Sequence, residues 1–536
     1  MGKMFFPQYM KGRKEGIRLM VGGSVLSHID KIGGIEIDSE PGEDIVRIEK
    51  GINLLNPLSK NEEKMFSEGK LKPGQRLASQ AKVINEQGDI SIFMSNFGKY
   101  TILTDIIKRD TELNPSVEKI KDRVLYKGEI DLGHYNGKIY GLAVDIGTTT
   151  VVMQVMDLES GENIYNPVAF KNPQITYGND IISRIGYTIE KPGGLKEIQD
   201  VVISGINESL AKLEKEATGV SGSIRDNIYD IVVVGNSTMR EIFFENDVKN
   251  LGLIPFEPTS KESILKRARE LGLEVNRNAM VYGVPLIGGH AGADCLSDVI
   301  ASRIYKNNEI SMIVDIGTNG EIVIGNKEKM FTASCAAGGA YEGYQISCGV
   351  GAIAGAITEV RINDGKIKYK TLENKPPVGI CGSGVIDLLA ELYKNGIMNS
   401  RTRIEKDYYI NEDIYISQDD INQLIMAKAG LRTDQDLLIK YFGTTAQDIH
   451  RIYLAGAFGN YMNIDNAMTI GLLPQVNKSK FIRFGNGALA GAMDMLLSRE
   501  LREDAESLKD FIKHEKPNEV EGQNFQYIVA DNMYFN

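Results

Sequence analysis

A short motif occurs twice in this chain of 536 residues and limits the folds that the chain can adopt. LAVDIGTTTVVMQVMD at 142–157 returns as MIVDIGTNGEIVIGN at 312–326. Each copy is an apolar run, Asp-Ile-Gly-Thr, a turn and a second apolar run, which predicts a β-hairpin with a polar tip. Asp145 and Asp315 lie 170 residues apart. This separation is too long for a short tandem array and predicts one hairpin in each lobe of a two-lobed protein.

The tips of both hairpins carry groups suited to phosphate. Gly147 and Gly317 allow the backbone to turn and to approach a ligand closely. Turn amides can donate to phosphate oxygens, as in an anion-binding nest. Hydroxyl groups add donors at Thr148, Thr149, Thr150 and Thr318. The alternative is a plain hairpin turn, where Asp and Gly are common. Two copies, each followed by a strand-like run, favour phosphate binding over that alternative.

Three carboxylates accompany these tips. Asp145 and Asp315 would sit at strand ends that face the same gap. Like charges repel, so a carboxylate cannot hold phosphate itself; it suits Mg²⁺, usually through water, or it orients a water nucleophile. Glu321 would face the cleft at a strand period of two, or it would be a solvated position. We predict Asp145, Asp315 and Glu321 as catalytic residues, the two aspartates also as metal ligands.

Bulk properties exclude several classes of protein. The net charge is −11 without any basic block, so nucleic acid is not an expected partner. No apolar run reaches membrane-spanning length, and the N-terminus lacks the apolar core of a secretion signal. The four cysteines are widely spaced, without a C-x-x-C pair. A disulfide framework is therefore not expected, and the pattern favours a reducing, cytoplasmic compartment.

The texture of the chain predicts an α/β protein with several parts. Residues 1–100 contain short β-like pieces joined by glycine-, proline- and charge-rich turns, and 101–138 form a charged connector. From about 139 to 500, strands and helices alternate in two halves, at about 139–308 and 309–500, followed by an extension at 501–536. Helical spacing of apolar residues predicts helices at 194–217 and 293–306. Strand–helix–strand order in both halves favours the α/β class.

Glycine-rich turns after later strands add further predicted contacts to a nucleotide. GICGSG opens a helix, and a helix N-terminus preceded by glycines is an anion site. Small residues in YLAGAFGN would let adenine and ribose lie against backbone. Asn236 and Ser237, after the strand IVVVG, could bind the ligand or cap the next helix. The predicted nucleotide contacts, beyond those above, are Gly235, Asn236, Ser237, Asn319, Gly382, Ser383, Gly384, Gly456, Ala457 and Gly459.

In these motifs the chain resembles the actin, sugar-kinase and Hsp70-like (ASKHA) ATPase superfamily. VDIGTTT is similar to its first phosphate loop, VDIGTNG to its second, and IYLAGAFGN to its adenosine motif. The resemblance implies an ATPase with two ribonuclease-H-like lobes that close on Mg-ATP.

Within that superfamily the chain resembles the reductive activators of corrinoid enzymes. The motifs that carry the likeness are NPQITYGNDIISRI at 172–185, VVVGNSTM at 232–239, DIGTNGE at 315–321, AAGGAYEGYQISCG at 336–349, GICGSG at 379–384 and AGAFGNYMN…IGLLP at 455–474. The resemblance implies ATP-driven return of a methyltransferase corrinoid protein from Co(II) to Co(I), and a homodimer.

The N-terminal region departs from that family. Relatives usually begin with a plant-type ferredoxin domain whose four cysteines hold a [2Fe–2S] cluster. Here the cysteine loop is cut to Ser39-Glu40-Pro41-Gly42, RLACQ has become RLASQ with Ser79, and no cysteine precedes Cys295. We therefore expect residues 1–100 to form a β-grasp, ferredoxin-like domain without a cluster, and electrons to come from a separate ferredoxin or reductase.

Three alternatives stay open. The ATPase could remodel a cofactor enzyme mechanically, as the reactivases of the same superfamily do. It could be a small-molecule kinase, with Asp315 or Glu321 as the base. Cys335 and Cys348 could hold a [4Fe–4S] cluster between two subunits, although buried structural thiols are the favoured interpretation.

Overall fold

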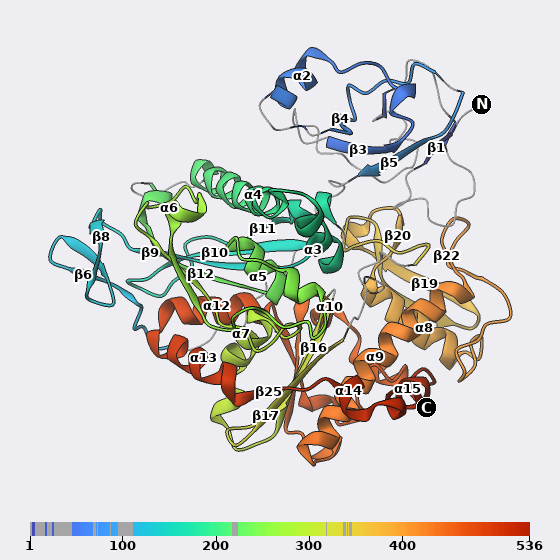
Figure 1. The fold of residues 1–536 in the computed structure, drawn as a ribbon. Coiled ribbons are helices and arrows are strands. Elements are labelled where there is room, and N and C mark those ends of the chain that lie inside the picture. Colours follow the sequence, from blue (N-terminus) through green and yellow to red (C-terminus); the bar gives the residue numbers. More distant parts are fainter. Residues whose placement is uncertain are drawn as a thin grey trace.

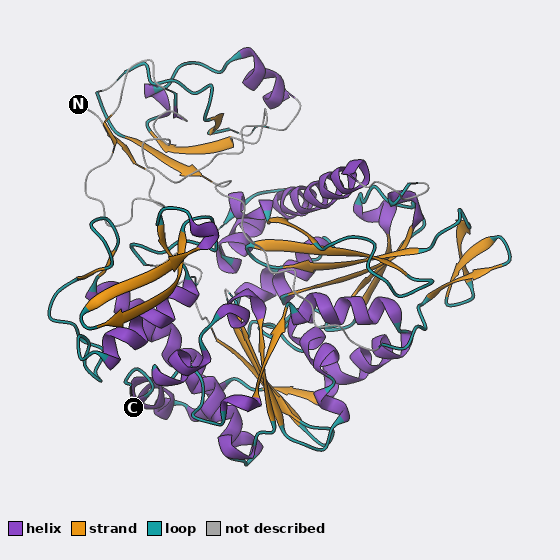
Figure 2. Cartoon of the chain, turned by 180° about the vertical axis from the view of Figure 1, so that it is seen from behind, coloured by secondary structure: helices purple, strands orange, loops and turns teal. Residues whose placement is uncertain are grey.

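A computed structural model describes residues 3–5, 17–18, 24–25, 45–67, 71, 73–85, 87–94, 111–178, 180–216, 223–317, 319–335, 339, 341 and 346–535. Figure 1 shows two large lobes, with a smaller N-terminal unit beside them. Sheets form the centre of each lobe and helices cover them (Figure 2).

The first predicted hairpin lies at the centre of the first lobe. β9 (Tyr140–Ile146) and β10 (Thr150–Asp157) pair antiparallel, with Asp145 opposite Val152. The sheet order is β11-β10-β9-β12-β14-β13, in which β12 and β14 run parallel to β9. The remaining strands are β11 (Val168–Lys171), β12 (Ile228–Gly235), β13 (Ile264–Arg267) and β14 (Met280–Gly283).

The second lobe repeats this topology. β15 (Ser311–Ile316) and β16 (Gly320–Gly325) form the second hairpin, with Asp315 opposite Glu321. The order is β24-β23-β15-β16-β17-β25, with β23 and β24 parallel to β15. The other strands are β17 (Met330–Cys335), β23 (Arg451–Ala455), β24 (Phe481–Gly485) and β25 (Ile512–His514). In each lobe the two strands of the hairpin and the next strand of the chain form an antiparallel meander. The first strand of the hairpin also pairs, on its other edge, with a parallel strand. The repeated motif therefore marks a repeated sheet arrangement.

Two helices pack against each other between the sheets. α7 (Ala293–Ser302) and α12 (Gly487–Leu497) share an apolar core with Val232 of the first sheet and Ile313 of the second. Gly491 permits this close approach, because a Cβ there would lie 2.2 Å from the carbonyl oxygen of Ser297. α13 (Arg499–Phe511) then packs on the first lobe. The predicted boundary at residue 500 thus falls inside α13.

Other helices cover the outer faces. On the first lobe these are α3 (Ile181–Glu190), α4 (Gly194–Glu216), α5 (Ser237–Phe243) and α6 (Ala268–Leu271). On the second they are α8 (Gly382–Lys394), α9 (Gln418–Phe442), α10 (Gly456–Tyr461) and α11 (Ile464–Thr469), followed by α14 (Pro517–Glu521) and α15 (Gln523–Asp531). The helix predicted at 194–217 matches α4. The one predicted at 293–306 stops at Ser302, because Arg303 adopts a left-handed conformation with φ 57°.

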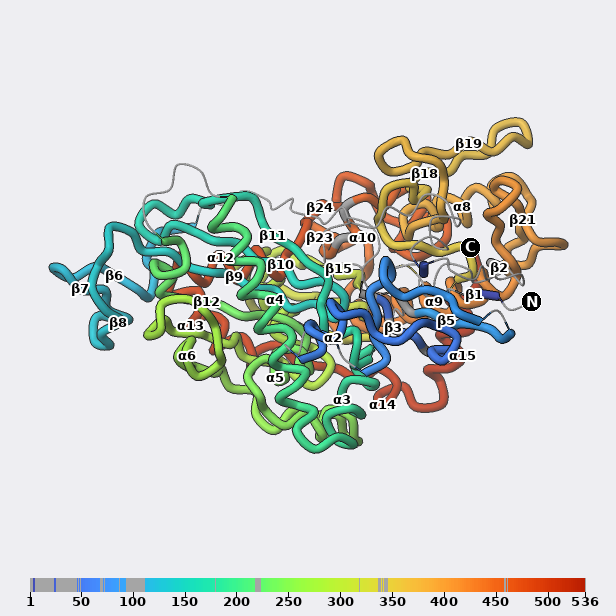
Figure 3. The backbone as a smooth tube through the Cα atoms, turned by 90° about the horizontal axis from the view of Figure 1, so that it is seen from above, coloured from blue at the N-terminus to red at the C-terminus, as the bar shows by residue number. Residues whose placement is uncertain are grey.

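Small sheets extend the second lobe at one end of the molecule. The opposite end carries the sheet of β6 (Val117–Ile120), β7 (Arg123–Tyr126) and β8 (Ile130–His134) (Figure 3). β18 (Ala356–Asn363), β19 (Lys366–Thr371) and β20 (Gly379–Ile380) form one, and β21 (Tyr408–Tyr409) and β22 (Tyr415–Ile416) another. The first of them positions the GICGSG turn, since β20 leads directly into α8.

The predicted connector contains a sheet of its own. β6 (Val117–Ile120), β7 (Arg123–Tyr126) and β8 (Ile130–His134) form an antiparallel meander that projects from the first lobe (Figure 1). Val124, Tyr126 and Leu132 are buried in the core that α7 and α12 share. Apolar residues there alternate with charged ones, which gives the segment its charged, linker-like composition. Residues 101–110 of the connector lie outside the described residues.

The described part of the N-terminal unit is a mixed sheet of order β2-β1-β5-β3-β4 with one helix. Its elements are β1 (Lys3–Phe5), β2 (Ile17–Arg18), β3 (Ile45–Lys50), α2 (Lys60–Ser67), β4 (Gln75–Leu77) and β5 (Ile90–Met94). The shortened loop Ser39-Glu40-Pro41-Gly42 lies outside the described residues. RLASQ is held by a buried ion pair, with Arg76 Nε 2.8 Å from Glu62 Oε1.

Candidate functional site

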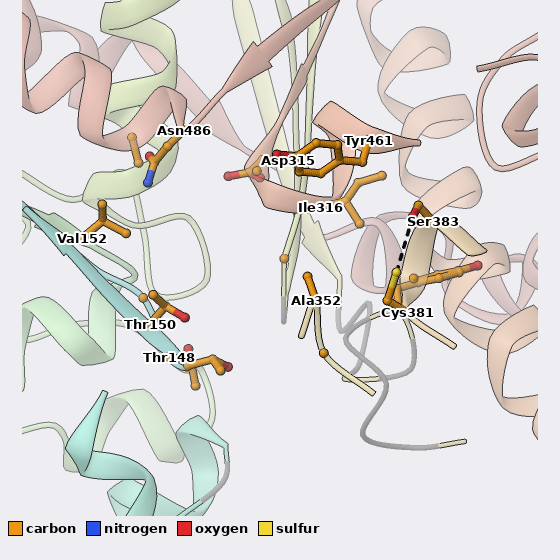
Figure 4. Close-up of a pocket in the computed structure, with 18 of the residues that line it drawn as sticks. Thr148, Thr150, Val152, Asp315, Ile316, Ala352, Cys381, Ser383, Tyr461 and Asn486 are labelled. Carbon is orange, nitrogen blue, oxygen red and sulfur yellow. Dashed lines mark hydrogen bonds between the residues drawn. The ribbon is translucent and has the colours of Figure 1, made fainter. Parts of the chain in front are cut away.

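A cavity of about 470 Å³ lies between the two lobes. Figure 4 shows Thr148 and Thr150 of the first hairpin on one side, and Ala352, Cys381 and Ser383 on the other. Asp315 of the second hairpin lies between these walls. Both copies of the repeated motif therefore open onto one space, as the sequence predicted.

The first hairpin tip is fixed from behind. Gly147 N donates to the carbonyl of Thr150 (3.0 Å), which closes the turn. A Cβ at Gly147 would lie 2.6 Å from that same carbonyl oxygen, so a side chain does not fit there. Asn236 Nδ2 donates to Thr148 Oγ1 (3.1 Å), and Asn236 Oδ1 accepts from Met239 N (3.0 Å). Asn236 thus caps α5, as one of the two alternatives predicted, and it also lines the cavity.

Four carboxylates line the floor of the cavity: Asp145, Asp315 and Glu321 come from the hairpins, and Asp294 comes from α7. A fifth carboxylate, Asp298, stands four residues after Asp294 on the same face of α7 and lies outside the lining. Asn486 Nδ2 donates to Asp145 Oδ2 (2.8 Å). Asp298 is 1% exposed, and its carboxyl interacts electrostatically with those of Asp315 and Asp294.

Burial raises the pKa of every carboxyl in this group. It raises the pKa of Asp145 to about 7, where the charge of Asp315 adds to the effect and the hydrogen bond from Asn486 opposes it. Burial raises the pKa of Asp315 to about 6 and that of Asp294 to about 7. The pKa values of Asp298 and Glu321 lie well above their usual range, chiefly through burial and then through the neighbouring carboxylates. Such a concentration of negative charge favours a bound cation.

Glycines at three strand-to-helix turns make room for these carboxylates. A Cβ at Gly292 would lie 2.7 Å from Asp294 Oδ1, and one at Gly487 would lie 2.1 Å from Asp298 Oδ1. At Gly456, where φ is +79°, a Cβ would lie 2.4 Å from Asp315 Oδ1. A side chain at any of these positions would have to displace the carboxylate that it meets.

The opposite wall is formed by turns around small residues. Gly382 and Ser383 begin α8 with Cys381 as its N-cap, and Ser383 Oγ donates to the carbonyl of Thr358 (2.9 Å). Cys381 Sγ lies 3.5 Å from Ser383 Oγ (Figure 4). Tyr461 at the end of α10 lines the cavity although it is 55% exposed, which places it at the mouth.

Most residues predicted from the sequence line this cavity. They are Asp145, Gly147, Thr148, Thr149, Thr150, Asn236, Asp315, Gly317, Asn319, Glu321, Gly382, Ser383 and Gly456. Gly235, Ser237, Gly384 and Gly459 lie outside the lining; Ser237 Oγ instead donates to the carbonyl of Gly288 (2.6 Å). Thr318 lies outside the described residues, as does the side chain of Ala457.

Three polar residues at or beside the cavity were not predicted from the sequence. Asp294 and Asp298 were recognisable as an i, i+4 pair on a predicted helix, and hence as neighbours on one face. Asn486 stands in FGNG, a strand-to-helix turn of the same kind as AFGN in the adenosine motif.

The cysteines are free: Cys295 and Cys381 are buried, Cys335 and Cys348 partly so.

Comparison with known families decides what kind of lobes these are. Residues 140–307 match the RACo middle region, and residues 309–535 match the C-terminal domain of RACo, the ASKHA domain. The chain belongs to the RACo family. Its fold is therefore the two-lobed fold that the repeated hairpins predicted, and it is of the actin-like class that the superfamily resemblance implied.

Individual relatives agree with this family. The chain is 35% identical over 391 residues to the corrinoid activation enzyme RamQ of Eubacterium limosum, covering 68% of this chain and 65% of that one. It thus spans slightly less than two thirds of that relative. It is 26% identical over 392 residues to the [Co(II) methylated amine-specific corrinoid protein] reductase of Methanosarcina barkeri, covering 68% and 71%.

A solved structure shares the whole fold. The reductive activator for corrinoid, iron-sulfur protein superposes with a TM-score of 0.70 at 28% identity, covering 100% of this chain and 98% of that one. The alignment spans the full length of the chain, the N-terminal unit included. Across the described residues, no helix has both the length and the apolar character needed to span a membrane.

Proposed function

We propose that this chain binds and hydrolyses ATP in the cavity between its lobes and thereby activates a corrinoid protein. The observation that carries the proposal is the meeting of both hairpins at one cavity, with carboxylates of both lobes on its floor, in a member of the RACo family. Two relatives are named for acting on corrinoid proteins, which supports a client of this class.

The residues present fit Mg-ATP. Carboxylate oxygens are the hard donors that Mg²⁺ prefers, and Mg²⁺ usually takes one or two carboxylates together with waters and phosphates. Within the described ranges, no three His, Cys, Asp or Glu side chains are grouped so as to hold an ion by themselves. Asp145 and Asp315 are the ligands that we propose. When bound, Mg²⁺ would neutralise charge that develops on the phosphates.

The chain's own groups divide the remaining work. The hydroxyls of Thr148, Thr149 and Thr150, with the turn amides, would donate to phosphate oxygens. Asp315 and Glu321, opposite each other on β15 and β16, would orient the attacking water. Gly382 and Ser383 at the start of α8, with Gly456 at the start of α10, would contact the nucleoside. Closure of the lobes would couple nucleotide state to the client.

Cobalt is the substrate of the activation that we propose. The protein would support the reduction of the corrinoid from Co(II) to Co(I), with one electron from a separate ferredoxin or reductase. Thiolate is the usual ligand of iron in such clusters, and residues 1–100 contain no cysteine. We therefore propose that the N-terminal unit does not hold a [2Fe–2S] cluster. We also propose that the active protein is a homodimer, as the resemblance to the activator family implies.

An anaerobic assay tests this function. A purified methylamine-type corrinoid protein in its Co(II) form is mixed with this protein, Mg-ATP and a reduced ferredoxin, and Co(I) is followed by its visible spectrum. We expect Co(I) to appear only with ATP and ferredoxin together. ATP hydrolysis without any Co(I) would favour mechanical remodelling. Phosphate transferred to a small acceptor would contradict the proposal in favour of a kinase.

A further inference from the structure

The segment 172–185, NPQITYGNDIISRI, carries part of the family resemblance, and none of its described residues lines the cavity. It runs from the end of β11 through a short turn into α3 and lies directly behind the first hairpin tip. We call this segment the brace.

Two residues of the brace hold three successive carbonyls of the tip. Asn172 Nδ2 donates to the carbonyl of Gly147 (2.8 Å), and Asn172 N donates to the carbonyl of Thr149 (2.8 Å). Arg184 Nη2 donates to the carbonyl of Thr148, which lies between them (2.6 Å). Asn172 and Arg184 are both 0% exposed, so water does not compete for these bonds.

This arrangement sets the direction of the tip amides. In a trans peptide the C=O and the N–H of one unit point in opposite directions. Holding the carbonyls of Gly147 and Thr148 from behind therefore turns the N–H groups of Thr148 and Thr149 away from the brace. Thr148 and Thr149 line the cavity. The brace thus orients donors before any ligand arrives, which is how preorganised anion sites gain strength.

Arg184 also brings a charge. Its guanidinium donates further to the carbonyl of Gly178 (3.0 Å) and lies 3.4 Å from Gln174 Oε1. No ion pair joins it to a carboxylate within the described ranges, although the exposed Asp180 acts on it from a distance. A buried charge without a counter-ion is costly. Phosphate bound at the tip would supply the missing negative charge.

We infer that Arg184 and Asn172 are positioning residues for the nucleotide's phosphates: they fix the first hairpin tip, and the Arg184 guanidinium adds positive potential beneath it. This inference rests on the proposed function. The inference extends the proposed function, because it assigns phosphate recognition to the brace and the first hairpin tip and nucleoside recognition to the opposite wall.

The test compares a ligand with phosphates to one without. Calorimetry gives dissociation constants for Mg-ATP and for adenosine with the wild type, Arg184→Met, Arg184→Lys and Arg225→Met. Arg225 is a matched control, because it lies on the same lobe in ion pairs with Glu214 and Glu274 and outside the cavity. Arg184→Met is expected to raise the Kd of Mg-ATP about tenfold or more and to leave adenosine within about twofold. Arg184→Lys should recover part of the loss.

Equal losses for Mg-ATP and adenosine, or an unchanged Kd for Mg-ATP in a folded Arg184→Met protein, would overturn the inference. If Arg184→Met does not fold, Asn172→Asp makes the same comparison, since it loses the Nδ2 bonds to the carbonyl of Gly147 and to Gln174 Oε1 and keeps the Oδ1 acceptor for Gln174 N. A wild-type protein that binds no Mg-ATP would contradict the proposed function itself, so the two failures are distinguishable.

Discussion

Asn486 Nδ2 donates a hydrogen bond of 2.8 Å to Asp145 Oδ2, and the two residues belong to opposite lobes. Asn486 directly follows β24 of the second sheet and caps α12, where its Oδ1 accepts from Leu489 N (2.7 Å). One side chain therefore starts a central helix and fixes a carboxylate of the first hairpin.

Asn486→Asp should separate these two roles. It keeps the cap acceptor but places a second carboxylate against Asp145, which disfavours ionisation of that group. We expect the Kd of Mg-ATP to rise about tenfold with little change in Tm. Asn486→Ala should additionally lose about 1 kcal/mol of stability through the cap. The control is Asn477→Ala, which removes an exposed cap far from the cavity. Unchanged affinity in both Asn486 variants would show that the bond is dispensable.

Folding stability should depend on pH through the buried carboxyls. Burial raises the pKa of Asp145 in the folded chain from its ordinary value of 3.8 to about 7, and that of Asp315 to about 6. Protonation is thus favoured in the folded state, so this contribution is fully present below pH 3.8 and is lost as the pH rises through about 6 and 7. The measurement is urea unfolding at several pH values for the wild type and for Asp145→Asn with Asp315→Asn.

The wild type should lose stability relative to the double variant as the pH rises from about 4 to about 7. Saturating Mg-ATP should reduce the difference, because metal binding favours the ionised carboxylates. A difference that does not change with pH would show that these groups ionise as freely in the folded chain as in the unfolded one.

Gly456→Ala should disturb the site more than its backbone conformation alone explains. Gly456 and Gly443 have nearly the same φ, 79° and 78°. A Cβ at Gly456 would lie 2.4 Å from Asp315 Oδ1, whereas one at Gly443 would meet nothing within 4 Å. Both substitutions should cost about 1 kcal/mol through the backbone. Only Gly456→Ala is expected to lower ATP hydrolysis, by about tenfold or more. Equal activities of the two variants would exclude the steric explanation.

The N-terminal unit should purify without iron. RLASQ carries Ser79 where relatives are expected to have a cysteine, and the first cysteine of the chain is Cys295. Anaerobically purified protein should show less than stoichiometric iron and no visible absorption from a cluster. Because one thiolate cannot replace four, Ser79→Cys should show the same result. Stoichiometric iron in the wild type would refute the cluster-free assignment, and a Cys335→Ser, Cys348→Ser protein would then show whether those thiols hold it.

Local patterns in the sequence predicted the elements that carry the site. Both DIGT hairpins, α4 and the glycine turns before α8 and α10 follow from periodicity and turn chemistry within a few residues. The contact between Asn486 and Asp145 could not be predicted in this way, because it joins positions 341 residues apart that no local pattern relates. The same holds for Asp298, whose place beside the hairpins depends on how α7 packs against α12 between the sheets.

Two other differences between the sequence-based predictions and the structure have local causes. The β6–β8 sheet was hidden by charged residues at its exposed positions, which made a folded segment look like a linker. Ser237 follows the strand IVVVG, where a ligand contact and a structural bond look alike in sequence. In the structure the hydroxyl of Ser237 donates to the carbonyl of Gly288, and Asn236 lines the cavity instead.

The most direct test of the account is calorimetric titration of Mg-ATP into the wild type and into Asp145→Ala and Asp315→Ala, with ATP hydrolysis measured on the same samples. We expect one site per chain in the wild type, and a loss of hydrolysis of about a hundredfold in each variant. Absence of binding in the wild type, or full hydrolysis after both substitutions, would contradict the assignment of this cavity as the nucleotide site.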